Sequence, residues 1–326
     1  MEIIVVGVKG FGKVHLRSLK GVDVSIVERD ESVVKDVIST YRIKNVYRSY
    51  EEALKSDAEI IDLAVPHNLH KDFAVRAFEN GKHVIVEKPI APTVKDAMDM
   101  ISSARSHGLK LNVAEQYHFD PSLNEAVRLM KEGKIGKPLT IFVRDQRIYD
   151  KSGWRARKES MGGGALIDGG IHYVHSMLML GGKYRKLTSR VSKGGSSLEG
   201  EDNAVALFDF NNGANGILYY SWSYVNPPSV PGFEIIGSEG SIYEIPGTRS
   251  QEDFKKPERR TAFGDIALNG VPMKVEIYDV FEREMSEFIR SVRDDTAEPL
   301  PPEQALEDLR TVLDIYSQTD KSAVGN

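Results

Sequence analysis

The chain has no cysteine among its 326 residues, which excludes disulfides, thiolate-bound zinc and a cysteine nucleophile. It also lacks long apolar stretches: the run Met177-Leu178-Met179-Leu180, one of the longest, falls far short of the roughly 18 residues that a membrane span needs. Positive charge is not in excess, because 43 Lys and Arg against 48 Asp and Glu leave a net charge of -5. We therefore expect no nucleic-acid partner and no membrane association.

The amino-terminal residues show no secretion signal. Met1-Glu2 leads straight into the apolar run 3–6, with no basic segment and no small-residue cleavage site. This pattern predicts a cytoplasmic protein whose first strand begins at once. The length of 326 residues predicts about two domains.

The first 120 residues alternate short apolar runs with longer helical segments. The runs 3–6, 22–27, 60–64, 83–86 and 111–114 are nearly continuous in apolar character, as strands of a parallel sheet covered on both faces are. Ser49 and Thr93 stand where helix caps are expected. These features predict a doubly wound α/β domain.

After Pro121 the pattern changes. A helix over 122–131 is followed by strands predicted at 139–147, 186–192, 204–210, 217–225, 233–236 and 241–245, with hairpin signals between them. This predicts a second, α+β domain with a mostly antiparallel sheet, before helical periodicity returns at 279–293 and 303–318. Leu218, Tyr220, Trp222 and Tyr224 share one strand face, which either packs on the domain's own helices or forms a subunit interface.

A glycine-rich segment, Gly7-Val8-Lys9-Gly10-Phe11-Gly12, follows the first strand and opens a helix, which is the context of a dinucleotide-binding loop. Gly7 and Gly12 fit the first and third glycine positions, but Lys9 occupies the second. Either Gly10 takes over the close approach to the pyrophosphate, or the Lys9 side chain swings out and its amide still binds phosphate. A turn without any ligand is the third interpretation.

Glu28 ends the second strand 21 residues after Gly7 (28 − 7 = 21). A carboxylate at this place is expected to accept hydrogen bonds from both adenosine ribose hydroxyls. It favours NAD, because it would repel the 2′-phosphate of NADP. Arg29 can pair with that phosphate, so NADP stays the alternative.

Two more groups follow predicted strands at the same sheet edge. One is Glu87-Lys88-Pro89 and the other is Pro66-His67-Asn68-Leu69-His70. A lysine at such an edge can donate to a substrate hydroxyl or move its proton. Taken in isolation, both groups are also typical of polar surface turns.

Asp168 and His172 lie four residues apart in a helical pattern, so they share a face and can act on one substrate. The ordinary pKa of histidine suits a general base. Gly169 and Gly170 lie between these two residues, and in a helix each costs roughly 1 kcal/mol of stability relative to alanine. Their presence therefore indicates the close approach of a ligand or another chain segment. With only His175 as a third candidate ligand, no metal site is predicted. The alternative is that His172 has a structural role only, with its hydrogen bonds satisfied within the helix.

In order and spacing, these motifs resemble the glucose-fructose oxidoreductase / inositol dehydrogenase (Gfo/Idh/MocA) family. The resemblance spans nearly the whole chain. It rests on the glycine loop with His15, the 66–70 group, Glu87-Lys88-Pro89, Trp154-Arg155, Gly162-Gly163-Gly164, Asp168 with His172, Gly237-Ser238-Glu239-Gly240-Ser241 and Pro301-Pro302. Departures are Lys9, and His118 where an arginine is common.

The resemblance implies a Rossmann domain over 1–120, a substrate-binding and oligomerisation domain over 121–279 with a large open sheet, and a segment of about 280–326 that packs back on the first domain. It also implies homodimers or homotetramers formed through the sheet. The expected catalytic residues are Lys88, Asp168 and His172. The expected cofactor-binding residues are Gly7, Lys9, Gly10, Phe11, Gly12, Glu28, Arg29, Pro66, Asn68, His70, Glu87, Lys88, Trp154 and Arg155. The expected substrate-binding residues are Lys88, Tyr149, Arg155, Asp168 and His172.

The predicted activity is NAD(P)-dependent transfer of a hydride between a nicotinamide cofactor and a carbinol carbon of a sugar, inositol or sugar derivative. In this prediction His172 removes the hydroxyl proton, Lys88 hydrogen-bonds the same oxygen, and Asp168 orients His172 or binds an adjacent hydroxyl. One alternative is an oxidoreductase that retains its cofactor through both half-reactions. The other is a non-catalytic dinucleotide-binding regulator on the same fold.

Overall fold

The computed structural model describes residues 1–248 and 261–323. The chain divides into two compact units: unit 1 comprises residues 1–115 and 281–306, and unit 2 comprises residues 116–280 and 307–326. The sequence assigned all of 280–326 to the first domain, whereas residues from 307 onward group with unit 2. The predicted range 121–279 includes residues 249–260, which lie outside the described residues.

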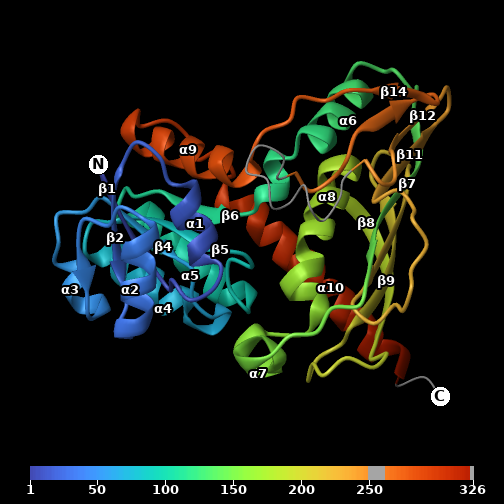
Figure 1. Cartoon of the computed structure of the whole chain (residues 1–326). Helices are drawn as coiled ribbons and strands as arrows, with labels where there is room; N and C mark the ends of the chain where they lie inside the picture. Colours follow the sequence, from blue (N-terminus) through green and yellow to red (C-terminus); the bar gives the residue numbers. More distant parts are fainter. Residues whose placement is uncertain (249–260, 324–326) are drawn as a thin grey trace. The chain divides into compact units, whose positions relative to one another are not determined.

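Unit 1 is built on a six-stranded parallel sheet in the order β3-β2-β1-β4-β5-β6, with helices packed around it (Figure 1). The strands are β1 (Glu2–Val6), β2 (Asp23–Val27), β3 (Val46–Tyr47), β4 (Ile60–Leu63), β5 (His83–Glu87) and β6 (Leu111–Ala114). The predicted strands are all present, and β3 is additional because two residues show no periodicity. The strand order reverses between β1 and β4, where sheets of this kind bind ligands at their carboxyl ends.

The helices of unit 1 begin where their caps predict. Ser49 accepts a hydrogen bond from the Glu52 amide and Thr93 accepts one from the Asp96 amide. The helices are α1 (Gly12–Ser18), α2 (Glu31–Thr40), α3 (Tyr50–Leu54), α4 (His70–Glu79), α5 (Val94–Ser106) and α9 (Val280–Arg293), with a short 3-10 turn η1 (His67–Leu69). Met285, Phe288 and Ile289 of α9 are buried in the same core as β1 and α1.

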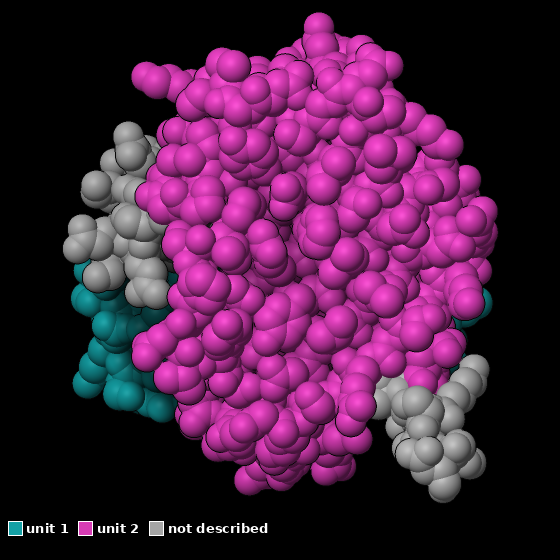
Figure 2. Space-filling view, turned by 90° about the vertical axis from the view of Figure 1, so that its right-hand side faces the viewer, with its two compact units in different colours: residues 1–115, 281–306 teal, residues 116–280, 307–326 magenta. Residues whose placement is uncertain are grey.

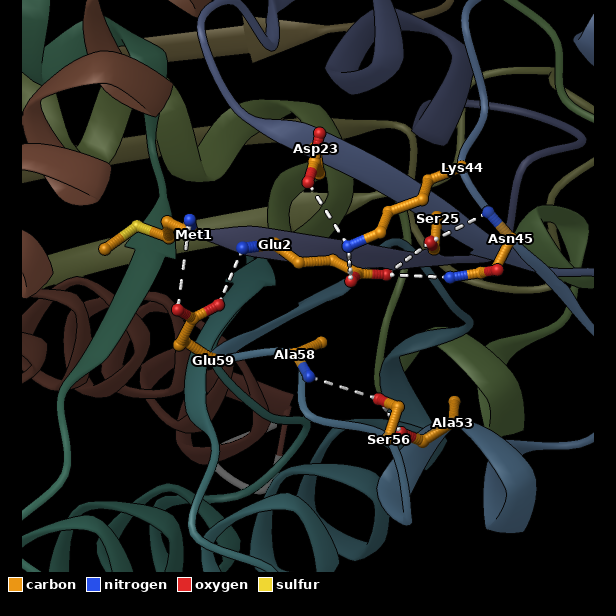
Figure 3. Close-up of polar contacts among 10 residues, drawn as sticks. All are labelled: Met1, Glu2, Asp23, Ser25, Lys44, Asn45, Ala53, Ser56, Ala58 and Glu59. Atoms are coloured by element: carbon orange, nitrogen blue, oxygen red, sulfur yellow. Dashed lines mark hydrogen bonds and ion pairs between the residues drawn. The ribbon is translucent and has the colours of Figure 1, made fainter.

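A polar network ties together the amino ends of β1 and β2 (Figure 3). Glu2 accepts hydrogen bonds from Ser25 Oγ at 2.5 Å and from Lys44 Nζ at 2.7 Å. Lys44 also lies 3.2 Å from Asp23 Oδ2. Burial tends to raise the pKa of the Glu2 carboxyl, but the hydrogen bonds from Lys44 and Ser25 outweigh it and lower this pKa. This network lies at the end of the sheet opposite the glycine loop.

Unit 2 contains an eight-stranded mixed sheet in the order β14-β13-β12-β11-β7-β10-β9-β8, in which only β7 and β10 pair in parallel among the described strands. The predicted fold class is therefore confirmed. The strands are β7 (Pro138–Gln146), β8 (Tyr184–Ser192), β9 (Asn203–Phe210), β10 (Asn215–Ser221), β11 (Phe233–Gly237), β12 (Ser241–Glu244), β13 (Ile266–Leu268) and β14 (Val271–Met273).

Within residues 116–248 and 261–323, the helices of unit 2 cover one face of this sheet and leave the other bare (Figure 1). The helical elements are η2 (Gln116–Phe119), α6 (Pro121–Lys131), η3 (Gly153–Ala156), α7 (Lys158–Met161), the π-helical turn η4 (Leu166–Gly170), α8 (Ile171–Gly181) and α10 (Pro302–Ala323). The later part of α10 is held by unit 2, since Tyr184 Oη donates to Asp314 and Ser189 Oγ donates to the Ile315 carbonyl.

The predicted aromatic face on β10 packs inward. Leu218, Tyr220 and Trp222 are almost completely buried, while Tyr224 lies beyond the end of the strand and is partly exposed. The predicted strand 217–225 thus ends at Ser221. Of the two interpretations of this face, packing on the unit's own helices is correct.

Among residues 1–248 and 261–323, no helix has both the length and the apolar character needed to cross a membrane.

Candidate active site

The glycine loop of unit 1 has the local geometry that its sequence predicts. Gly7 has a φ of 98°, which favours glycine, and a Cβ there would collide with the carbonyl of Ala64 after β4. A Cβ on Gly12 would collide with the Gly7 carbonyl. A Cβ on Gly10, by contrast, would meet no atom within 4 Å. Gly7 and Gly12 are therefore required by the fold, whereas Gly10 borders open space.

Lys9 extends away from the loop. Its Nζ lies 3.2 Å from Asp30 Oδ2 and 3.9 Å from Glu28 Oε1. Of the two sequence interpretations that keep a bound dinucleotide, the outward orientation of this side chain agrees with the second. Phe11 packs against Phe281 of α9, with their ring centroids 6.0 Å apart.

Glu28 is fixed at the end of β2 by its neighbours. Its Oε1 accepts hydrogen bonds from the backbone amides of Arg29 and Asp30, at 2.8 and 3.0 Å. The Arg29 guanidinium is held in turn by the carbonyl of Arg48, to which Nε donates at 3.0 Å. The carboxylate is thus oriented before any ribose binds.

The residues after β4 form the turn η1 and the start of α4. Pro66 is half-buried and Asn68 is exposed, whereas His70 is completely buried. The two ring nitrogens of His70 each lie 3.0 Å from a backbone carbonyl, one of Pro89 and one of Val65. Burial lowers the pKa of His70. Its ring therefore links the end of β4 to the Lys88-Pro89 turn, and a direct contact with a cofactor stays a prediction.

Glu87 and Lys88 lie at the carboxyl end of β5, where both side chains are buried. Glu87 Oε1 lies 2.9 Å from His15 Nε2. His15 Nδ1 in turn lies 2.9 Å from both carboxylate oxygens of Asp62 in the middle of β4. The predicted site residue Glu87 is thus part of a buried hydrogen-bonded chain.

In unit 2, Asp168 and His172 are carried by consecutive helical elements. Asp168 lies in the π-helical turn η4 and His172 in the first turn of α8. Arg155 Nε lies 3.8 Å from Asp168 Oδ2, and the Arg155 guanidinium lies over the Trp154 ring, 4.9 Å from its centroid. The structure therefore brings together Trp154, Arg155 and Asp168, while their contacts with cofactor and substrate stay predictions.

The glycines beside Asp168 are required by packing. A Cβ on Gly169 would collide with the hydroxyl of Tyr220 and would lie 2.7 Å from Trp222 Cζ2. A Cβ on Gly170 would lie 2.9 Å from Tyr220 Cδ1. Of the two explanations that the sequence allowed, the close approach of another chain segment accounts for both glycines.

His172 is held by an aromatic partner that the sequence did not reveal. Its ring stacks on that of Tyr117, with a centroid distance of 4.5 Å and an interplanar angle of 13°. The Tyr117 hydroxyl lies 3.3 Å from that of Tyr173, which also accepts a hydrogen bond from Arg147 at 3.3 Å. Arg147 is paired with Asp145 at 2.6 Å. A polar chain from β7 therefore ends at the ring that orients His172.

A cavity of about 180 Å³ lies in unit 2 next to this chain. Arg144 and Gln146 of β7 line it, together with Tyr173 and part of the loop 228–232. Tyr149 does not line it and instead packs edge-on against Trp222, with ring centroids 5.0 Å apart. Substrate contact by Tyr149 therefore stays a prediction.

His175 has partners of its own. Its Nδ1 lies 2.8 Å from Asp308 of α10, and its Nε2 lies 3.3 Å from His118 Nδ1. His118, the departure from the family pattern noted above, thus reaches a buried histidine and carboxylate pair.

Comparisons with known proteins agree with this architecture. Residues 1–115 match the description "Oxidoreductase family, NAD-binding Rossmann fold", and residues 123–243 match the GFO/IDH/MocA C-terminal domain. A trans-1,2-dihydrobenzene-1,2-diol dehydrogenase from Xenopus tropicalis is 30% identical over 271 residues, which cover 81% of this chain and 76% of that protein.

Two further similarities differ in extent. A levoglucosan dehydrogenase from Pseudarthrobacter phenanthrenivorans is 28% identical over 214 residues, 57% of this chain, and the match spans only 55% of that relative. The crystal structure of an oxidoreductase from Thermotoga maritima superposes with a TM-score of 0.85 at 25% identity, covering 98% of this chain and 96% of that one. The chain belongs to the Gfo/Idh/MocA oxidoreductase family, with an NAD-binding Rossmann fold at its amino terminus.

Proposed function

We propose that this protein is an NAD-dependent dehydrogenase of a sugar, inositol or sugar derivative, acting at a carbon that bears a hydroxyl. The observation that carries the proposal is the buried pair Asp168 and His172 in a chain whose other unit has the Gly7 and Gly12 geometry of a dinucleotide-binding loop. The names of two relatives, levoglucosan dehydrogenase and trans-1,2-dihydrobenzene-1,2-diol dehydrogenase, support a hydroxyl-bearing substrate.

The residues of unit 1 fit a dinucleotide. The open space beside Gly10 leaves backbone exposed to a pyrophosphate, and the tight turn at Gly7 brings the loop close to β4. Glu28, oriented by two amides, would accept the hydrogen bonds of the adenosine ribose. The carboxylate favours NAD over NADP, because a 2′-phosphate would meet its negative charge.

A nicotinamide ring, when bound, supplies the hydride acceptor or donor. The protein's own task is to move the hydroxyl proton and to stabilise the charge on oxygen. His172, stacked on Tyr117, would take that proton, and Lys88 would donate a hydrogen bond to the same oxygen. Asp168 would hold an adjacent hydroxyl or orient the imidazole.

The proposal is tested by assaying the purified protein with NAD and NADP against a panel of sugars, inositols and their derivatives. His172→Ala and Lys88→Ala are each expected to lower kcat by about 10²- to 10⁴-fold. His107→Ala, an exposed histidine on unit 1, is the matched control and should leave turnover unchanged. Undiminished turnover in the His172 and Lys88 variants would refute the mechanism.

Two other outcomes would favour the alternatives. Nicotinamide absorbance that survives dialysis would favour a retained cofactor that is recycled through both half-reactions. Cofactor binding without turnover on any substrate, together with capture of a protein partner, would favour a regulator.

We also propose that the protein forms a homo-oligomer through the bare face of the unit 2 sheet, which faces the viewer in Figure 2. Leu207 and Val205 of β9 are 52% and 43% exposed, and they pair in register with Ile217 and Tyr219 of β10. These neighbours form a continuous apolar surface on the outer side of the sheet. Sedimentation of the wild type and of Leu207→Lys tests the proposal, since a buried lysine should shift the protein toward monomer.

A further inference from the structure

Unit 1 contains a buried group of ionisable side chains whose role is not explained by nucleotide binding. We call it the His15 cluster, and it comprises His15 of α1, Asp62 of β4, Glu87 of β5 and Glu284 of α9. His15, Asp62 and Glu284 are completely buried, and Glu87 is nearly so. Burying charges is costly unless they are paired, so the arrangement calls for a compensating benefit.

Both ring nitrogens of His15 face carboxylate oxygens. Its Nδ1 lies 2.9 Å from both Asp62 oxygens, and its Nε2 lies 2.9 Å from Glu87 Oε1. An imidazolium donates from both nitrogens and suits two carboxylates that accept. Burial lowers the pKa of His15, but Asp62 and Glu87 outweigh burial and raise this pKa well above its ordinary value. The geometry and the pKa together favour an imidazolium that bridges the two carboxylates.

The remaining acid of the cluster is in a different state. Neither carboxyl oxygen of Glu284 has a hydrogen-bond partner in the described part of the chain. Burial raises the pKa of Glu284 well above its usual value, and Glu87, Glu115 and Asp62 raise it further, while His15 lowers it. The neutral form of Glu284 is therefore favoured beside the His15 bridge.

Sheet geometry connects the His15 bridge to Lys88. Asp62 is paired in register with Ile85, and Glu87 lies two residues beyond Ile85 on the same strand. Asp62 and Glu87 therefore project from the same face of the sheet, toward His15 on α1. Glu87 is also the last residue of β5, and the next residue is Lys88. The His15 bridge thus ties the backbone from which Lys88 emerges to both β4 and α1.

We propose that His15 is a positioning residue for Lys88: its imidazolium clamps Glu87 to Asp62 and so holds the start of the Lys88 side chain in place. This inference rests on the proposed function, in which Lys88 donates to the reacting oxygen. A buried ionic bridge is rigid because each partner is costly to leave unpaired. Such rigidity is what a catalytic group needs, since small displacements reduce turnover strongly.

The first test concerns charge and does not depend on turnover. In full-length protein labelled with ¹⁵N-histidine, the His15 signals are assigned by their loss in His15→Gln. We expect both ring nitrogens to remain protonated at pH 8, above the ordinary titration of histidine. A neutral His15 ring at pH 7 would overturn the proposal, whatever substrate the protein turns over.

The second test concerns Lys88. With ¹³C-lysine labelling, the Cε signal of Lys88 is assigned by its loss in Lys88→Arg. In His15→Gln we expect this signal to move, because the bridge that holds Glu87, the residue before Lys88, has been removed. His83→Gln, the same change at the other end of β5, is the matched control and should leave the signal in place.

The third test measures turnover. His15→Gln should lower kcat by about 10-fold or more, while the KM for NAD stays within about 3-fold of the wild-type value. Should His15→Gln fail to fold, Glu87→Gln serves instead, because it keeps the imidazole and its contact with Asp62. Glu87→Gln is expected to lower kcat in the same way while the KM for NAD stays within about 3-fold of the wild-type value. A folded variant with wild-type kcat and an unmoved Lys88 signal would show that the bridge is merely structural. If no substrate is found at all, the proposed function fails, while the two spectroscopic tests still decide the role of His15.

Discussion

Lys9 reaches from the glycine loop to the end of β2, where its ammonium lies 3.2 Å from Asp30 and 3.9 Å from Glu28. A hydrogen bond from Ser32 and a second from Lys9 lower the pKa of Asp30 to about 2. The residue that interrupts the glycine pattern therefore places a positive charge against the carboxylate expected to select the ribose. Lys9 should therefore reduce the preference for NAD over NADP that the Glu28 carboxylate would impose alone.

The first prediction concerns this charge. Lys9→Ala should weaken NADP binding relative to NAD by about 3- to 10-fold at low salt, because the negative charge facing a 2′-phosphate is then less neutralised. Glu28→Ala should change the ratio in the opposite direction. Calorimetric titration with NAD and with NADP measures the ratio of the two affinities. Lys13→Ala, which removes a lysine of α1 that is paired with Asp36 of α2, is the control. A tighter NADP complex in Lys9→Ala would contradict this account.

The second prediction concerns Gly10. Because a Cβ there meets no atom within 4 Å, Gly10→Ala should leave the melting temperature unchanged. It should nevertheless weaken NAD binding by about 10-fold if this position takes over the close approach to the pyrophosphate. Thermal unfolding and calorimetry separate the two effects. Gly12→Ala is the contrast, since its Cβ collides with the Gly7 carbonyl and should lower stability. Unchanged affinity in Gly10→Ala would assign phosphate binding to the Lys9 amide instead.

The third prediction concerns the ring that supports His172. Tyr117→Leu removes the stacked surface and should lower kcat by roughly 10- to 100-fold, because the imidazole is no longer held in one orientation. Tyr117→Phe keeps the ring and should retain most of the activity, although the contact with the Tyr173 hydroxyl is lost. Steady-state kinetics of the two variants measure the difference. Equal losses in both would mean that the hydroxyl, rather than the ring, supports His172.

The fourth prediction concerns the pH dependence of stability. The pKa of Glu284 is raised well above its ordinary value in the folded protein, chiefly by burial. Between those two values the folded state holds a proton that the unfolded state has lost, so the free energy of unfolding decreases as pH rises, by up to about 1.4 kcal/mol per pH unit. Glu284→Gln removes this loss, so its stability relative to wild type should increase from pH 5 to pH 8.

Denaturant titrations at several pH values test this prediction. Glu287→Gln on the same helix is the control, because Glu287 is ion-paired with Arg283. An identical difference between Glu284→Gln and wild type at every pH would show that Glu284 is already ionised in the folded state.

Much of this architecture could be predicted from the sequence. The strands of unit 1 are apolar runs bounded by polar segments, and such runs are visible in any single sequence. Glu28, Lys88, Asp168 and His172 could be proposed as site residues because each lies at a strand end or repeats at helical spacing. The role of Tyr117 could not be predicted, because its contact with His172 joins two segments that are distant in the chain and leaves no local pattern.

The sequence indicates part of the His15 cluster. Asp62 is the single charge inside the apolar run 60–64, and such a residue needs a buried partner. Glu284 lies four residues after Val280 and four before Phe288, on the apolar stripe of its helix. Which buried groups meet could be decided only by the three-dimensional arrangement, since His15, Glu87 and Glu284 come from three separate regions of the chain.

The return of α9 to unit 1 has a consequence for biosynthesis. Met285, Phe288 and Ile289 complete the core formed by β1 and α1, yet they are translated some 280 residues later. A ribosome-bound chain that has emerged only as far as β6 therefore has all six strands of the nucleotide-binding sheet but an uncovered apolar surface. The nucleotide-binding unit can therefore reach its final packing only after α9 has been synthesised, and until then its sheet lacks the helix that completes this core.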